Sequence, residues 1–126
     1  MNLADYFENA SGMGVLSTAD TDGKVNAAVY SRPHFLEDGT VALIMRDRLS
    51  HANLKSNPHA AYLFIEKGSG FKGKRLYLTK VREEEKSELL VKLKRRQVTP
   101  EADAEKGPLF LVIFKIDKEL PLVGAE

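Results

Sequence analysis

The residues with the clearest potential for chemistry lie between an apolar run, residues 41–45, and a polar stretch, residues 51–56. Arg46, Arg48 and Ser50 stand at this junction, and the pattern predicts a helix over residues 51–56 with Ser50 as its N-cap. A helix N-terminus attracts anions through its N–H groups and its dipole, and an arginine adds two parallel donors for a phosphate. The sequence therefore predicts a phosphate-binding site where this helix begins.

Other residue types that carry catalysis form no known motif. The three histidines, His34, His51 and His59, fit no metal-binding spacing such as HExxH, and we expect them on the surface or in loops. No serine lies in a GxSxG motif, no carboxylate pair stands out, and no GxGxxG motif follows a predicted strand. We therefore predict no catalytic side chain and no metal site, and expect the chemistry to belong to a bound cofactor.

Length and charge limit the class of protein. The chain has 126 residues, which suits one domain with a single core, so we expect residues 1–126 to form one domain. The net charge of +1 offers no general attraction for nucleic acid or anionic membranes. The chain has no cysteine, no signal-peptide pattern at its start and no apolar run of the roughly 18 residues that a membrane span needs. We therefore expect a soluble cytoplasmic protein.

Apolar runs separated by turn residues predict a mainly β protein. Strands are expected over residues 13–19, 24–35, 41–45, 59–67, 74–83 and 108–118, with one helix over residues 3–10 and another that opens at residues 83–85. The first three strands follow one another through short turns, which indicates an antiparallel meander. Six strands with a few short helices fit a small antiparallel barrel with helices at its ends, because closure removes exposed edges.

The last predicted strand, residues 108–118, is apolar on both faces. Phe110, Val112 and Phe114 face one way, and Leu111 and Ile113 face the other. Such a strand is expected to be buried on both sides. One side would face the barrel interior, and the other would face a partner subunit.

Three segments occur in this order: GVLSTADTDGKVNAAVYSRPHF, DGTVALIMRDRLSHANLKSNPHAAYLF and GKRLYLTKVREEE. Their order resembles the FMN-binding split-barrel superfamily, which includes pyridoxamine 5′-phosphate oxidase and small FMN-binding proteins. The resemblance covers residues 13–85 well and the last strand loosely. It implies a mainly β (α+β) fold, a six-stranded antiparallel split barrel with short flanking helices.

The resemblance also implies where the FMN phosphate would bind. Arg46, Arg48 and Ser50 fall where members of the superfamily place phosphate ligands, and Asn53 lies in the helical segment beside the phosphate. The superfamily often has lysine at the position of Ser50. Arg46 or Arg48 would then have to supply the positive charge.

Further residues are implied near the flavin ring. Asn26, Ser31 and Arg32 lie on the segment that resembles the flavin-lining strand, and Lys74 and Arg75 resemble residues that reach the flavin of the other subunit. An arginine near the pyrimidine edge would stabilise negative charge on reduced flavin. The implied assembly is a homodimer with two FMN sites at the subunit interface.

The leading hypothesis is a small flavoprotein that acts as an oxidoreductase or electron-transfer protein on an unidentified small-molecule or protein partner. Oxidation of pyridoxamine 5′-phosphate is not expected, because the chain ends at Glu126 without the Arg- and His-bearing segment with which those oxidases hold their substrate. A second hypothesis is a non-enzymatic carrier or sensor of another ligand, such as a deazaflavin or haem. A third is an interaction module with an empty cleft.

Overall fold

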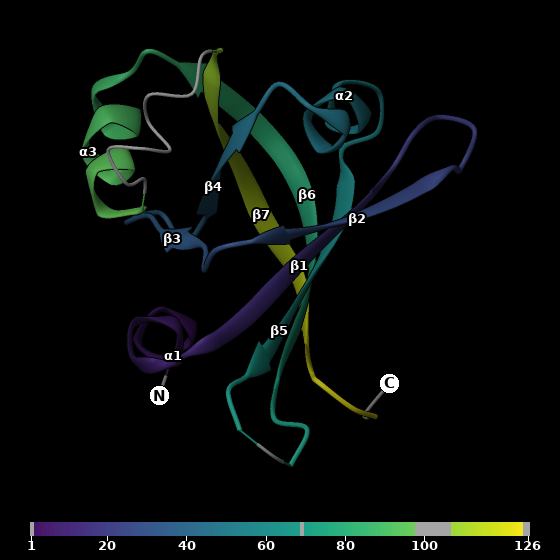
Figure 1. Ribbon diagram of the computed structural model, residues 1–126, viewed down its shortest axis with the longest axis vertical. Coiled ribbons are helices and arrows are strands. Elements are labelled where there is room, and N and C mark those ends of the chain that lie inside the picture. The colour runs from purple at the N-terminus through teal and green to yellow at the C-terminus, as the bar shows by residue number, and fades with distance from the viewer. Residues whose placement is uncertain (1, 69, 98–106, 125–126) are drawn as a thin grey trace.

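The computed structural model describes residues 2–68, 70–97 and 107–124. The elements in chain order are α1 (Leu3–Asn9), β1 (Gly12–Ala19), β2 (Val25–Tyr30), β3 (His34–Phe35), β4 (Val41–Arg46), α2 (Leu49–Ser56), β5 (His59–Glu66), β6 (Gly73–Glu85), α3 (Glu88–Gln97) and β7 (Leu109–Pro121). The strands form one antiparallel sheet that curls into a half-barrel, with the short helices beside it (Figure 1). In these described residues, no helix has both the length and the hydropathy to cross a membrane.

The order of the strands shows how the sheet is split. It is β2-β1-β5-β6-β7-β4-β3, so β2 and β3 are the two edge strands. The single strand expected over residues 24–35 is divided between them, and the described sheet has seven strands and not the predicted six. Pro33 lies in the break and lacks the N–H that strand pairing needs. Both short-turn pairings, β1 with β2 and β3 with β4, are antiparallel as predicted. The prediction of one continuous meander is wrong, because the chain crosses from one edge of the sheet to the other between β2 and β3.

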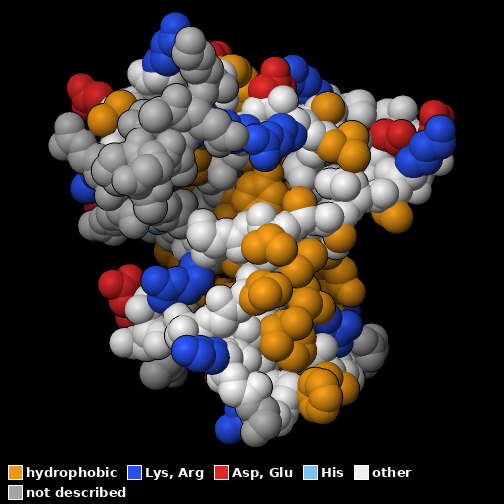
Figure 2. All heavy atoms as spheres, viewed as in Figure 1, with side chains coloured by type: hydrophobic (Ala, Val, Ile, Leu, Met, Phe, Trp, Pro, Cys, Tyr) orange, Lys and Arg blue, Asp and Glu red, His pale blue; other side chains and the backbone are white. Residues whose placement is uncertain are grey.

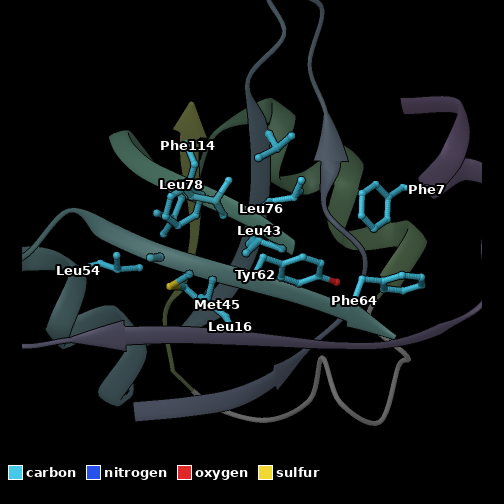
Figure 3. Packing of buried hydrophobic residues seen from close by; sticks show 13 residues of the cluster. Phe7, Leu16, Leu43, Met45, Leu54, Tyr62, Phe64, Leu76, Leu78 and Phe114 are labelled. Atoms are coloured by element: carbon cyan, nitrogen blue, oxygen red, sulfur yellow. The ribbon is translucent and has the colours of Figure 1, made fainter. Parts of the chain in front are cut away.

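The main core lies inside the curl of the sheet (Figure 3). Alternate residues of the strands point into it, and α1 and α2 each contribute one buried side chain. The labelled members are Phe7, Leu16, Leu43, Met45, Leu54, Tyr62, Phe64, Leu76, Leu78 and Phe114. Burial of each such side chain stabilises the fold by about 1.5–3 kcal/mol, so this core holds both helices against the sheet.

Tyr62 crosses the inner face of β1 at a glycine. A Cβ on Gly14 would lie 2.0 Å from Tyr62 Oη and 2.7 Å from the backbone oxygen of Tyr30. The Tyr62 hydroxyl donates a 2.9 Å hydrogen bond to the backbone oxygen of Ser31, directly after β2. Gly14 therefore leaves room for a buried tyrosine that fixes the place where the chain leaves β2.

A second, smaller core lies on the other side of β4 and β7. Leu90 and Leu93 of α3 pack there against Ala42, Leu111 and Ile113. The second apolar face of β7 is therefore covered by α3 of the same chain, and the prediction that a partner subunit covers it is wrong.

The start of α3 also differs from the prediction. Residues 83–85 still belong to β6, and the helix begins at Glu88. The Ser87 hydroxyl accepts a 3.0 Å hydrogen bond from the backbone N–H of Leu90, as an N-cap does. The cap, and not the run of glutamates, sets this helix start.

Candidate functional site

The N-terminus of α2 lies two residues after β4. Arg48 occupies the N-cap position with an extended backbone, so Ser50 is the second helical residue and the prediction that it is the N-cap is wrong. The Arg48 side chain makes no capping hydrogen bond, and the first turn of the helix has no acidic residue. The N–H groups and the positive dipole end of α2 therefore keep their capacity to bind an anion.

Ser50 connects this helix start to the inner face of β2. Asn26 Nδ2 lies 3.4 Å from Ser50 Oγ. The Tyr30 hydroxyl shares a hydrogen bond with Ser50 and lies within electrostatic reach of Arg48. The structure thus brings the predicted residues Asn26, Arg48 and Ser50 together.

Tyr30 completes this cluster. It lies within residues 26–31, the segment that the resemblance places along the flavin, but it was not singled out as a site residue. Burial raises the pKa of its hydroxyl above 10.0, and the bond with Ser50 and the charge of Arg48 offset only part of that shift. The hydroxyl therefore keeps its proton at neutral pH and can act as a donor. The signal in the sequence was the even spacing of Asn26 and Tyr30 on one strand, which puts both side chains on the same face.

Asn53 fixes α2 to the sheet. Its side chain is buried, and Nδ2 donates a 3.0 Å hydrogen bond to Oγ1 of Thr18, a buried residue on β1. Leu54 follows it into the main core. The Asn53 amide, which was predicted to bind the cofactor, is therefore engaged in positioning the helix that carries Arg48 and Ser50.

His51 is fully buried, and the prediction that it lies on the surface or in a loop is wrong. Its Nδ1 lies 2.9 Å from Asp47 Oδ1, and its Nε2 lies 3.1 Å from Glu83 Oε2. The ring stacks on Phe110 at a centroid distance of 3.9 Å. Asp47 and His51 are four residues apart in the sequence, but Glu83 and Phe110 are brought to them only by the fold.

We call Asn26, Tyr30, Arg48 and Ser50 the α2 cluster. The side chain of Arg46 lies on a different face of β4 and does not belong to it. It alternates with Met45 on β4, so it lies on the face that carries Ala42 and Ile44, next to α3. Its Nη1 lies 3.3 Å from the backbone oxygen of Gly107. Of the two predicted arginines, Arg48 is the one beside Ser50.

Arg32 and Ser31 lie in the break between β2 and β3. Nη1 of Arg32 donates 2.8 Å hydrogen bonds to the backbone oxygens of Phe7 and Ala10. It thereby binds carbonyl groups at the C-terminal end of α1, where a cation is favourable. Ser31 is exposed, and its backbone oxygen accepts the bond from Tyr62.

Lys74 and Arg75 lie near the start of β6. Lys74 Nζ is 2.9 Å from Glu119 Oε2 and 5.2 Å from the Tyr6 ring centroid, while Arg75 Nε donates to Pro121 O at 2.9 Å. Nine residues of β6, about 30 Å at the usual rise, separate Lys74 from Glu83, which contacts α2. Within one chain, these two residues do not join the α2 cluster.

The outer face of β2, β1, β5 and β6 is apolar. The register aligns Val29, Val15, Leu63 and Arg75 in one row across these strands. Figure 2 shows apolar side chains gathered over the region where β1 and β5 cross. The large apolar side chains exposed on these strands are Met13, Val25, Val29, Ile65, Tyr77 and Val81. We call this surface the outer apolar face.

Several solved structures have similar folds, and two of them are described as binding FMN or FAD. An FMN-binding protein from Syntrophomonas wolfei subsp. wolfei matches with a TM-score of 0.79 and 23% identity, over 98% of this chain and 85% of the other. An F420 reductase matches with a TM-score of 0.73 and 14% identity, over 95% and 98%. An FAD-binding protein from Mesorhizobium loti matches with a TM-score of 0.59 and 18% identity, over 91% and 86%.

No protein-family model matches the chain, and no curated protein sequence matches it. The three structural matches described above, each under 25% identical, establish the fold. The chain has the split-barrel fold that the resemblance in its sequence predicted, with seven strands in its described sheet.

Proposed function

We propose that this protein binds FMN, with the flavin phosphate at the N-terminus of α2 and the ring system along β2. The observation that carries the proposal is the uncapped start of α2, where Arg48 and Ser50 lie beside Asn26 and Tyr30. The donor set suits a phosphate, because a guanidinium, a hydroxyl and helix N–H groups all present hydrogen atoms to an anion. The similar structures that bind FMN or FAD support a flavin as the ligand.

The chain's own residues would bind and orient the cofactor. Arg48 and the first-turn N–H groups would hold the phosphate, and Ser50, Asn26 and Tyr30 would supply hydrogen bonds along the path from phosphate to ring. A bound flavin supplies hydride or single-electron transfer. We therefore propose an oxidoreductase or electron-transfer role on an unidentified partner.

We further propose that the protein is a homodimer that pairs through the outer apolar face. Val25 is 82% exposed and Val29 71% exposed, which is unusual for valines in a sheet unless another surface covers them. Arg75 continues the row of Val29, Val15 and Leu63 on β6 and pairs in turn with Leu120 of β7, so it lies on the β7 side of that face. From there Arg75 would reach the site of the partner subunit. It is too far from α2 of its own chain to contribute to the site there.

A fluorescence titration of FMN with wild-type protein tests the cofactor assignment. Arg48→Ala should weaken the affinity about tenfold or more, because charged hydrogen bonds contribute about 1.5–3 kcal/mol each. Arg82→Ala is the matched control, since Arg82 lies at the surface and pairs with Glu84. Equal losses in both variants would contradict the phosphate assignment.

A deazaflavin is the second candidate ligand, because the F420 reductase shares the fold at a TM-score of 0.73. A competition experiment separates the two: F420 should fail to displace FMN at equal concentration if FMN is the cognate ligand. Displacement of FMN by F420 would favour the deazaflavin. The haem alternative stays a prediction.

A further inference from the structure

The outer apolar face has a hairpin turn at each of its two ends. The β1–β2 turn, between Ala19 and Val25, lies at one end, and the β5–β6 turn, between Glu66 and Gly73, lies at the other (Figure 1). The register separates them, because β1 begins beside Glu66 of β5 and ends beside Val25 of β2. The two ends differ in shape and in charge, and these differences decide how a second copy of the chain can pack on the face.

The end at the β1–β2 turn carries an apolar knob. Val25 is the first residue of β2, and its side chain is largely exposed. Side chains alternate along a strand, so Val25 lies on the outer side with Val29, whereas Asn26 lies on the inner side. Val25 therefore presents its side chain to any surface that packs on the outer apolar face.

The end at the β5–β6 turn carries a shallow hollow. Its volume is about 380 Å³, and its lining residues are Ser11, Gly12, Met13, Ile65, Glu66 and Lys67. Met13 and Ile65 are paired across β1 and β5, and both are exposed on the outer side. The hollow is thus mainly apolar and is large enough to admit a branched apolar side chain.

Phe71 stands in the β5–β6 turn, largely exposed to solvent. Its φ of 52° lies in the left-handed region, which aromatic residues rarely adopt. The base of the turn is fixed by backbone hydrogen bonds, of 2.8 Å from Glu66 N–H to Lys72 O and of 2.7 Å from Lys67 N–H to Ser11 O. The chain thus holds an aromatic ring in solvent at a fixed place, which favours an interaction surface at this end of the face.

The charges of the two turns are opposite. The β1–β2 turn contains Asp20, Asp22 and Lys24, a net charge of −1, and the β5–β6 turn contains Lys67 and Lys72, a net charge of +2. Asp20 Oδ1 accepts hydrogen bonds from the backbone N–H groups of Asp22 and Lys24, so this carboxylate is engaged within its own turn. Asp22, Lys67 and Lys72 are exposed and can pair with charges of another molecule.

A two-fold axis makes the choice between two orientations of the partner. In a two-fold interface, each contact from residue i to residue j is repeated from j to i. Parallel strands would place like turns together, with knob against knob and lysine against lysine. Antiparallel strands place each β1–β2 turn beside the partner's β5–β6 turn. Two twisted sheets that pack face to face cross at about 30°, which carries the start of β2 across toward the hollow between β1 and β5 of the partner.

We propose that a second copy of this chain packs on the outer apolar face with its strands antiparallel, so that Val25 of each chain occupies the hollow beside Met13 and Ile65 of the other. The proposal rests on the proposed function, from which it takes the homodimer and its face, and adds the orientation and the docking contacts. Asp22 then lies beside the partner's Lys67, and the partner's Phe71 covers the β1–β2 turn. The partner thereby holds the start of β2, the strand that carries Asn26 of the α2 cluster.

Cysteine cross-linking tests the orientation, since the chain has no cysteine of its own. In one chain, Val25 pairs with Ala19, six residues from Met13 on β1, so about 20 Å separate the two positions at the usual rise. A disulfide needs Cα atoms within about 7 Å, so any disulfide in Val25→Cys/Met13→Cys joins two chains. Mild oxidation should convert this variant to a covalent dimer, whereas the matched control Val91→Cys/Met13→Cys should stay uncross-linked.

A charge exchange tests the contact between the turns, measured as the dimer dissociation constant by sedimentation equilibrium without FMN. Asp22→Lys and Lys67→Asp should each weaken the dimer about threefold or more, because two exposed ion pairs are lost in each dimer. The double variant Asp22→Lys/Lys67→Asp should recover most of the affinity. A double variant weaker than either single variant would overturn the pairing of these turns. Circular dichroism confirms that each variant is folded.

The two experiments separate the orientation from the proposed function. Wild-type protein that sediments as a monomer at every concentration would refute the proposed homodimer, and the orientation would fall with it. A wild-type dimer whose Val25→Cys/Met13→Cys variant does not cross-link would overturn the orientation alone. Neither readout depends on whether FMN binds, which the fluorescence titration decides separately.

Discussion

Replacing Gly14 by alanine should destabilise the protein strongly. The new methyl group would lie 2.0 Å from Tyr62 Oη and 2.7 Å from the backbone oxygen of Tyr30, so the tyrosine or the β2 backbone must move. Overpacking of this kind costs about 1–3 kcal/mol, and loss of the hydrogen bond from Tyr62 to Ser31 costs about 1–2 kcal/mol more. The expected loss in the free energy of unfolding is therefore about 2–5 kcal/mol.

Urea unfolding followed by circular dichroism measures that loss. An unfolding entropy of about 0.26 kcal/mol/K for a chain of this length corresponds to a fall in Tm of about 8–19 °C. Tyr62→Phe is the companion variant, because its background already lacks the hydrogen bond to Ser31, while the ring carbon Cζ, 2.5 Å from the new methyl group, still clashes. Gly14→Ala should then be at least about 1 kcal/mol less damaging in the Tyr62→Phe background. A stability within about 0.5 kcal/mol of wild type, or equal losses in both backgrounds, would refute this account of the packing.

Three further predictions concern the site, the dimer and pH. Leu49 is exposed in the first turn of α2, where an acid favours the helix but repels a phosphate. Leu49→Glu should therefore bind FMN about fivefold more weakly than Leu49→Gln, while the free energy of unfolding stays within about 1 kcal/mol. Equal FMN affinities of the two variants would contradict this prediction. Val29→Glu should shift sedimentation toward the monomer, whereas Val91→Glu on the exposed side of α3 should not. The pKa of Glu83 lies below its ordinary value of 4.5, so Glu83 contributes stability at neutral pH that is lost as the pH falls below that value. The difference in urea midpoint between pH 7 and pH 3.5 should therefore be smaller in Glu83→Gln than in the wild-type protein.

The local part of the fold was predictable from the sequence. The apolar run at residues 41–45 and the polar stretch that follows predicted β4 and α2, and both are confirmed. The start of α2 was misplaced because Ser50, a good N-cap by type, instead bonds to side chains of β2. Such a bond depends on a strand 20 residues away in the chain, which no local rule includes.

The non-local part was not predictable in the same way. The break at Pro33 is visible in the sequence, but the crossing of the chain to the opposite edge of the sheet depends on which strands pair with β7. The burial of His51 likewise depends on Glu83 and Phe110, which lie 32 and 59 residues further along the chain. A histidine with no motif around it is expected at the surface, and only the assembled barrel gives it two carboxylates and an aromatic ring.

Absorbance spectroscopy during gel filtration shows whether the protein binds FMN as a dimer. Purified protein is mixed with excess FMN, and the absorbance of the eluate is recorded at flavin and protein wavelengths. We expect flavin bands that elute with the protein at the size of a dimer, in a ratio of one flavin to each chain. Protein that elutes without flavin absorbance, after incubation with FMN well above micromolar concentration, would contradict this expectation.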